Sequence, residues 1–163
     1  MGNSKSTGYK FSSNNLSGII PSFIGHLSGL YWLQLNNNSL YGELPLGLRN
    51  CTHLLVLDLG ENGFFGNIPE WIGELESLRI LRLHSNMFND MIPSQLCQLL
   101  GTIPESMPNL SFMGHLNLSY NNLSGRIPTR NQLKTLDDPS ICVGNSELCG
   151  AFIPKKCSID RHS

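Results

Sequence analysis

The sequence predicts a repeat solenoid of the α/β type, in which short coils stack along a right-handed superhelix. Two observations lead to this fold class. Six Ile-Pro or Leu-Pro steps recur along the chain, and successive prolines are separated by 24, 24, 24, 11 and 24 residues. A fixed period in the twenties is typical of solenoids. The pattern Leu-x-Leu-x-x-Asn also returns between these steps, at residues 33–38, 57–62, 81–86 and 116–121, with a weaker copy at 9–14.

The two leucines of this pattern predict one short strand in each coil. Residues i and i+2 of a strand point to the same face, so we expect Leu33 and Leu35 to point inward and Gln34 to point outward. Stacked coils then align their strands into a parallel sheet on the concave side of the solenoid.

The turn-forming residues of each coil predict how the chain leaves the strand. The asparagine turns the chain, and its amide can satisfy backbone groups that a tight coil would bury unpaired, so stacked copies form a ladder. A glycine three residues before the proline suits a positive φ, and Asp90 takes this position in the fourth copy. The proline then opens the outer segment, where we expect 3₁₀ or irregular structure on the convex side. These glycines are Gly18, Gly42, Gly66, Gly101 and Gly125.

The spacing of 11 residues between Pro93 and Pro104 interrupts the period. Residues 93–99 match the outer half of a coil and residues 100–104 match the end of one, so 13 residues carrying a strand and its asparagine are missing between them. We therefore expect the sheet to lose one rung, and the strands near 81–83 and 116–118 to meet across a bulge or not at all. Locally irregular structure is expected at 94–112.

Composition and charge exclude several classes of protein. The length of 163 residues indicates one domain, and a formal charge of −1 argues against a nucleic-acid-binding surface. No apolar run approaches the ~20 residues of a membrane span. The N-terminal segment has no apolar core of a signal peptide, but it fits the myristoylation pattern at Gly2 and Ser6. Two interpretations stay open there: acylation, or a chain that starts within a repeat.

Several stretches resemble the plant extracellular leucine-rich repeat family, among them NNLSGIIP, LLVLDLGENGFFGNIPEWIGEL and HLNLSYNNLSGRIP. Residues 129–157 resemble the C-terminal cap of plant receptor-like proteins, most specifically at Gly144–Gly150, and the subgroup of receptors for ethylene-inducing xylanase is the most similar. The plant form of the repeat implies a second sheet beside the first. The resemblance divides the chain into a remnant without a cap (1–8), about five repeats plus one shortened near 94–104 (9–128), a cysteine cap (129–157) and a tail (158–163).

The resemblance implies a function in recognition. Members of this family perceive microbial or developmental signals at the extracellular face of the plasma membrane and signal through a partner receptor kinase, without a cofactor. This chain then corresponds to a C-terminal ectodomain fragment that binds a protein or peptide ligand and a receptor-kinase ectodomain. Two alternatives remain open: a secreted inhibitor of microbial cell-wall-degrading enzymes, as in the polygalacturonase-inhibiting branch, and a truncated product without function.

The five cysteines divide by position in the repeat. The resemblance implies a cap disulfide between Cys149 and Cys157, and Cys142 could compete with that pair. Cys51 falls in a leucine position, which predicts a buried thiol, and Cys97 is expected to be half-buried on the convex side. No cysteine or histidine spacing fits a zinc site. Glycosylation sequons occur at Asn15, Asn37, Asn50, Asn109, Asn117 and Asn122, which favours descent from a secreted glycoprotein.

The outward positions of the concave strands are the candidate binding residues. Asp58 is expected to lie in one row with Arg82 and Gln34, because neighbouring strands are ~4.8 Å apart. Exposed Trp and Arg are favoured anchors of protein contacts, although a solvated polar face is the alternative. His84 near Asp58 has no serine or cysteine nucleophile at a matching position, so we expect no catalytic residues and no enzyme. The candidates are Trp32, Gln34, Asn36, Asp58, Glu61, Arg82, His84, His115 and Tyr120.

Overall fold

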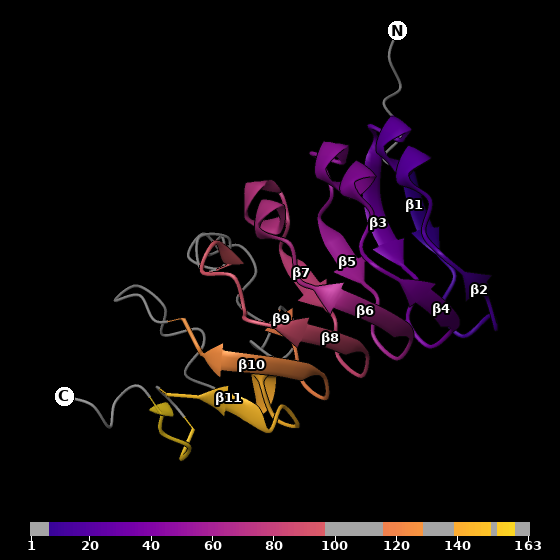
Figure 1. Ribbon diagram of the computed structural model, residues 1–163. Helices are drawn as coiled ribbons and strands as arrows, with labels where there is room; N and C mark the ends of the chain where they lie inside the picture. Colours follow the sequence, from indigo (N-terminus) through magenta and orange to yellow (C-terminus); the bar gives the residue numbers. More distant parts are fainter. Residues whose placement is uncertain (1–6, 97–115, 129–138, 151–152, 159–163) are drawn as a thin grey trace, which may run out of the picture.

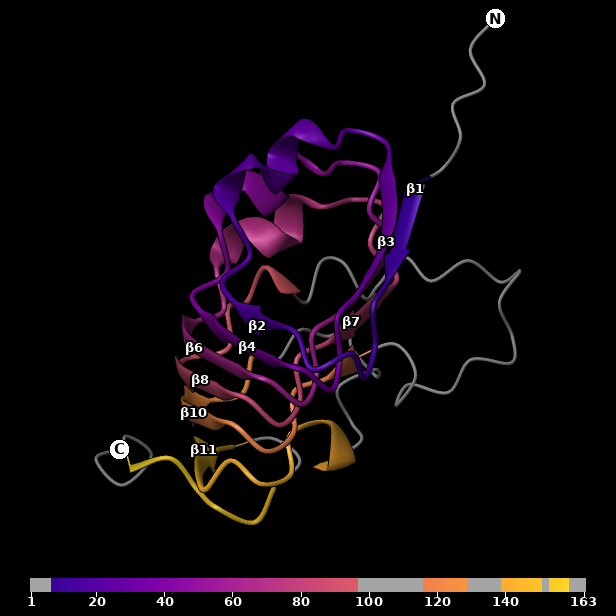
Figure 2. The ribbon, with the colours of Figure 1, turned by 90° about the vertical axis from the view of Figure 1, so that its right-hand side faces the viewer.

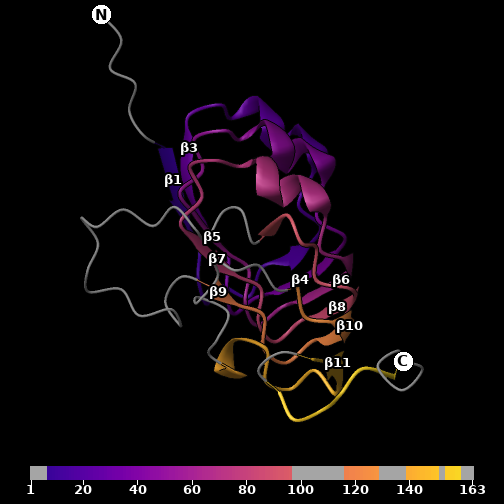
Figure 3. The ribbon, with the colours of Figure 1, turned by 90° about the vertical axis from the view of Figure 1, so that its left-hand side faces the viewer.

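Two parallel sheets run along the length of the solenoid, and 3₁₀ turns cover a third side (Figures 1, 2 and 3). The computed structural model describes residues 7–96, 116–128, 139–150 and 153–158. The expected irregular segment at 94–112 therefore lies mostly outside the described residues, as do Cys97, Gly101, Asn109 and His115.

The first sheet has five parallel strands in the order β1-β3-β5-β7-β9. Each strand holds the first apolar residue of the repeated pattern, a leucine in four strands and Tyr9 in β1, and ends just before the second, which confirms the prediction of one short strand for each coil. The strands are β1 (Thr7–Lys10), β3 (Leu30–Gln34), β5 (Val56–Asp58), β7 (Ile80–Arg82) and β9 (Leu116–Asn117).

The second sheet has six parallel strands in the order β11-β10-β8-β6-β4-β2. It confirms the second sheet that the resemblance to the plant form of the repeat implied. Its strands are β2 (Ser17–Gly18), β4 (Ser39–Gly42), β6 (Gly63–Asn67), β8 (Met87–Asp90), β10 (Asn122–Arg126) and β11 (Glu147–Cys149).

The convex side begins at the prolines. Pro21, Pro45 and Pro69 each directly precede a 3₁₀ helix and have φ of −72°, −72° and −71°. Proline suits this position because its ring already fixes φ near this value and because it has no N–H to leave unpaired. The 3₁₀ helices are η1 (Ser22–His26), η2 (Leu46–Asn50), η3 (Glu70–Glu74) and, in the cap, η5 (Pro139–Ile141).

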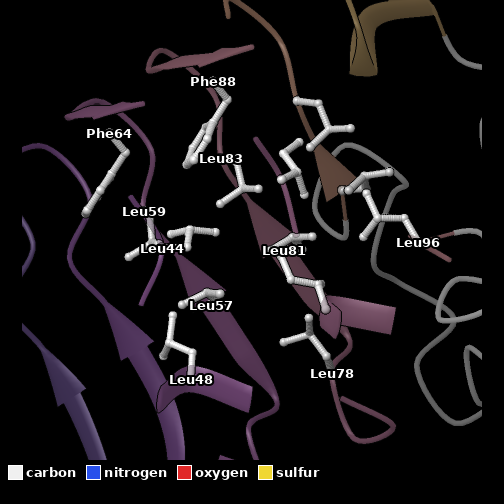
Figure 4. Packing of buried hydrophobic residues seen from close by; sticks show 14 of the residues in the cluster. Leu44, Leu48, Leu57, Leu59, Phe64, Leu78, Leu81, Leu83, Phe88 and Leu96 are labelled. Atoms are coloured by element: carbon white, nitrogen blue, oxygen red, sulfur yellow. The ribbon is translucent and has the colours of Figure 1, made fainter. Parts of the chain in front are cut away.

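One apolar core fills the space between the sheets and the 3₁₀ turns. The inward leucines of the first sheet are buried, and so is Cys51, which takes a leucine position on the convex side as predicted. The rings of Phe64 and Phe88 stack between adjacent coils, with centroids 6.3 Å apart. Figure 4 shows both rings and the leucines of their coils pointing into the same space. Each coil therefore buries its apolar face against its neighbours.

A ladder of asparagine side chains joins the coils at the turn between the two sheets. Asn86 donates from Nδ2 to the carbonyls of Leu59, Leu83 and His84 at 2.9, 3.2 and 3.1 Å. Its Oδ1 accepts the N–H of Phe64 at 3.0 Å. One amide thus satisfies backbone groups of its own coil and of the preceding coil, as the sequence predicted. The equivalent residues are Asn38, Asn62, Asn86 and Asn121.

Two positions of the repeat have a positive φ in successive coils. The glycine position was predicted, and it has φ between 83° and 105° at Gly18, Gly42, Gly66 and Gly125, with Asp90 at 68°. The residue before each ladder asparagine was not predicted to be left-handed. This position has φ of 54–57° at Asn37, Glu61, Ser85 and Tyr120.

The predicted break between the strands near 81–83 and 116–118 is wrong. β7 pairs with β9 in parallel, with Leu81 opposite Leu116 and Arg82 opposite Asn117. Asn121 Oδ1 accepts the N–H of Phe88 at 3.0 Å across 33 residues, whereas the same bond in the coil before spans 22 residues. The ladder and both sheets therefore continue in parallel register from the strands before residues 97–115 to the strands after them.

The C-terminal cap imitates one more coil. Asn145 donates to the Leu118 carbonyl at 3.0 Å and accepts the N–H of Leu123 at 3.0 Å, so it adds a fifth rung to the ladder. Cys142 takes the place of the second leucine, where it is buried and free, so it does not compete for the cap bridge. Cys149 and Cys157 form the disulfide that the family resemblance implied, with Cα atoms 5.0 Å apart.

Replacing Asn86 with alanine should lower the free energy of unfolding by about 2–4 kcal/mol, because several buried backbone groups would lose their partner. Asn121→Ala should cost a similar amount if the ladder closes over the long coil. Denaturant titration measures both, and Asn89→Ala on the exposed face of β8 is the control, with an expected change within about 0.5 kcal/mol. A near-zero cost for Asn121→Ala would contradict the continuous junction.

The buried thiols should resist alkylation in the folded protein. Burial raises the pKa of Cys142 to about 11 and also raises the pKa of Cys51. At pH 8 only about one Cys142 in a thousand is then a thiolate, which is the reactive form. We expect iodoacetamide to label Cys142 roughly a hundredfold more slowly in the native protein than after unfolding, as followed by mass spectrometry of peptides. Rapid labelling of Cys142 in the native protein would contradict this prediction, because it would show that the thiol is accessible to the reagent.

Candidate functional site

The outward positions of the first sheet form two rows across its strands. Trp32 lies opposite Val56, and Val56 opposite Ile80, which gives an apolar row. The next row is polar and confirms the predicted neighbours, since Asp58 lies opposite both Gln34 and Arg82. It continues to Lys10 at one end and Asn117 at the other.

Trp32 is the large aromatic side chain of this face and is half-buried. Its ring covers the backbone of Gly8 on β1, where an added Cβ would lie 2.2 Å from Cε3. The Lys10 ammonium lies 5.3 Å from the ring centroid, a cation–π contact that the sequence did not indicate. Tyr31 contacts the same side chain, with ring centroids 5.8 Å apart. Trp32 is therefore held in place before any partner binds.

Asp58 has a structural role that its outward position does not suggest. It is only 4% exposed, and its Oδ1 accepts the N–H of Gly60 at 3.1 Å. Its Oδ2 pairs with Arg82 Nη1 at 3.4 Å. About a third of the Arg82 side chain stays accessible, so the buried carboxylate orients a guanidinium that still reaches the surface. Arg82 is thus the member of the pair that can contact a partner.

His84 lies directly over Gly60 on the neighbouring coil. A Cβ on Gly60 would be 2.2 Å from His84 Cε1, so the ring fills the space that a side chain would take. His84 Nδ1 is buried and has no hydrogen-bond partner within the described ranges. Gly60 was missed as a site residue, although a glycine at an outward position was the signal.

The remaining candidates border this face. Gln34 and Asn36 are half-buried, and Asn36 Oδ1 accepts the Ser12 hydroxyl at 2.6 Å. Glu61 and Tyr120 are exposed on the left-handed turn positions. His115 lies outside the described part of the chain. Of the sequon asparagines that the structure describes, four are exposed and Asn117 is half-buried on β9; the exposed ones are Asn15, Asn37, Asn50 and Asn122.

The face is suited to non-covalent recognition of a polypeptide. It offers a flat aromatic ring, a guanidinium and an imidazole beside an apolar row, a combination that can pack against and hydrogen-bond to a chain. Within residues 7–96, 116–128, 139–150 and 153–158, no group of three or more His, Cys, Asp or Glu residues is placed to hold a metal ion. Over the same residues, no helix is long and apolar enough to cross a membrane.

A model of the leucine-rich repeat family matches residues 10–27, 53–75, 77–99 and 114–131, together half of the chain. Over 55 residues the chain is 40% identical to a probable leucine-rich repeat receptor-like serine/threonine-protein kinase of Arabidopsis thaliana. This match covers 34% of the chain and only 5% of that kinase, so the chain spans a small part of the curated relative's length.

Solved structures of plant receptor ectodomains share the fold. A chain of the Arabidopsis thaliana BIR3–SERK2 complex is 31% identical with a TM-score of 0.75, covering 91% of this chain and 72% of that one. A chain of the complex of the Arabidopsis receptor kinase HAESA with the peptide hormone IDA and the co-receptor SERK1 is 33% identical with a TM-score of 0.73, covering 90% and 22%. The ectodomain of the Arabidopsis thaliana receptor kinase SOBIR1 is 33% identical with a TM-score of 0.68, covering 85% and 70%.

Asp58→Ala should lower the free energy of unfolding by about 1–3 kcal/mol, because it removes the buried carboxylate that accepts the Gly60 N–H and pairs with Arg82. Glu61→Ala changes a neighbouring carboxylate that is exposed, so its expected effect stays within about 0.5 kcal/mol. Denaturant midpoints of the two variants make the comparison. Equal effects would show that the Asp58 carboxylate does not organise this face.

Proposed function

This chain belongs to the leucine-rich repeat family, and on that premise we propose that it is a protein-interaction module of a plant cell-surface receptor. In the proposal, the open face of the first sheet binds a peptide or protein ligand, and the module works with the ectodomain of a partner receptor kinase. The observation that carries it is a sheet face with Trp32 packed in place and Arg82 oriented by Asp58, on a solenoid that matches plant receptor ectodomains over most of its length.

The similar structures support a role in assembly with peptides and kinases. The chain is similar to part of a structure in which HAESA is in complex with a peptide hormone and the co-receptor SERK1. It is also similar to the ectodomain of the receptor kinase SOBIR1. By analogy, the proposal gives this chain a peptide ligand and a receptor-kinase partner, and it locates the chain at the extracellular face of the plasma membrane.

The geometry of the face favours recognition at low entropic cost. Trp32 is fixed between Gly8 and Lys10, and Arg82 is oriented by a buried carboxylate. Side chains that are already ordered lose less freedom when a partner binds, so more of the contact energy appears as affinity. Ile80, which lies in the same row as Trp32 and is half-buried, can pack against a side chain of an extended ligand.

Two finer features belong to the same proposal. The cap sequence supports membership of the subgroup that contains the receptors for ethylene-inducing xylanase, with a role in defence or developmental signalling. The exposed sequon asparagines Asn15, Asn37, Asn50 and Asn122 are accessible to N-glycans in a secreted form.

The test is binding of the secreted, glycosylated chain to plant receptor-kinase ectodomains, including those of SERK1 and SOBIR1, measured by surface plasmon resonance. The double variant Trp32→Ala/Arg82→Gln should weaken binding at least about tenfold, since both anchors of the face are removed. His26→Ala/His53→Ala, two exposed changes near the 3₁₀ side, is the matched control and should bind as the parent does.

Thermal unfolding of both variants establishes that they are folded at the temperature of the assay. The proposal fails if no ectodomain in the panel binds. It also fails if the folded Trp32/Arg82 variant binds as tightly as the control.

A further inference from the structure

A polar hollow lies on the side of the solenoid that the 3₁₀ turns cover (Figure 2). Its volume is about 720 Å³, which is within the range of roughly 300–1,000 Å³ for small-molecule sites. It spans three successive coils, and η2, η3 and the end of β6 supply most of its walls. The side chains that carry its chemistry are Arg49, Asn67, Glu70, Trp71, Glu74 and Gln95.

Two glycines leave the space for this polar hollow. Counted from the proline of each coil, Trp71 takes the position that Gly47 holds in the coil before. Arg49 in turn takes the position that Gly73 holds in the coil after. A Cβ added to Gly73 would lie 2.6 Å from the Cβ of Gln95, so the glycine lets that amide side chain approach closely. Trp71 and Arg49 thus each lie beside a coil that has no side chain at the same position.

The polar side chains of the hollow include one fixed pair and three free groups. Arg49 Nε donates to Glu74 Oε2 at 2.7 Å and Nη2 donates to Oε1 at 3.3 Å, so the guanidinium joins η2 to η3. These two side chains are 51% and 56% exposed and keep further N–H groups and lone pairs for a ligand. Across the described ranges, the side chains of Asn67, Glu70 and Gln95 have no hydrogen-bond or ion-pair partner. The hollow therefore offers unused donors and acceptors.

We propose that the polar hollow binds a neutral oligosaccharide. The half-buried ring of Trp71 packs against the C–H face of one sugar ring, and Leu46, which is 61% exposed, extends this apolar contact. The carboxylate of Glu70 accepts hydrogen bonds from hydroxyl groups. The amides of Asn67 and Gln95 both donate and accept, so they fit hydroxyls in either role. This site is separate from the open face of the first sheet, and it does not depend on the function proposed for that face.

Charge and topology favour a neutral sugar over other ligands. The carboxylates of Glu70 and Glu74 share the lining with the guanidinium of Arg49. A lining so close to charge balance favours an uncharged ligand over a polyanion or a polycation. An extended peptide that binds through its backbone needs an unpaired strand edge. β6 is paired with β4 on one side and with β8 on the other, so it offers no such edge to the hollow.

The two tryptophans of the chain make the test internal, because Trp71 lines the hollow and Trp32 lies on the open face. The chain is labelled with ¹⁵N-tryptophan and titrated with cellohexaose, xylohexaose and laminarihexaose. We expect at least one of these sugars to shift the indole N–H signal of Trp71, with a dissociation constant of about 1 mM or tighter. The signal of Trp32 should stay in place.

The double variant Asn67→Ala/Glu70→Ala should weaken this binding at least about tenfold, because two groups that bond to hydroxyls are removed. The matched control is Glu76→Ala/Asn89→Ala, which changes an exposed carboxylate and an exposed amide outside the hollow and should bind as the parent does. Thermal unfolding shows that both variants are folded at the temperature of the titration.

A saturable shift of Trp71 that the hollow variant loses and the control keeps supports the proposal. It is overturned if none of the three sugars shifts Trp71, or if the folded hollow variant binds as tightly as the control. A shift of Trp32 in place of Trp71 also overturns it, because the sugar would then lie on the open face. The Trp32→Ala/Arg82→Gln variant should keep its affinity for the sugar, so this proposal and the one for the open face can fail separately.

Discussion

The asparagine ladder is the constraint on which both sheets depend. Each coil turns sharply between a strand of the first sheet and a strand of the second, and at Asn86 and Asn121 the backbone groups of that turn are buried away from water. One amide, such as that of Asn86, bonds its own coil and the coil before it. Apolar burial supplies most of the stability but has no direction. The hydrogen bonds of the amide are directional, so a single side chain fixes the register of one coil against the next in both sheets.

Much of the fold was predictable from the sequence because each coil repeats the same physical choices. Leu57 and Leu59 mark a strand by their alternation, Pro69 marks the start of a 3₁₀ turn by its fixed φ, and Gly66 marks a left-handed backbone. These signals are local. The features that were missed depend on contacts between coils, which a single repeat does not reveal. Asn145 extends the ladder because it bonds to the Leu118 carbonyl. The coil that ends at Asn121 is in register with the coil before it because Asn121 bonds to the Leu83 carbonyl.

The candidate site shows the same division between local and non-local information. The strand pattern placed Gln34, Asp58 and Arg82 in one row correctly, because register follows from the period. It gave no account of burial within that row. Asp58 turned out to be covered and bonded to Gly60, and Trp32 to be packed against Gly8 and Lys10. Which outward residue remains free to contact a partner depends on the size of the side chain one strand away, and a single repeat does not contain that information.

The long coil has a consequence for how such a solenoid can change over evolutionary time. The ladder bond from Phe88 to Asn121 closes a loop of 33 residues with the same geometry as the 22-residue loops elsewhere. In a simple polymer estimate, the added closure entropy costs only about 0.4 kcal/mol. A coil of this kind can therefore change in length at that point at a small cost in closure entropy, because the ladder bond is kept and the coils that follow stay in register. The length of one coil can therefore vary without a change in the register of the two sheets.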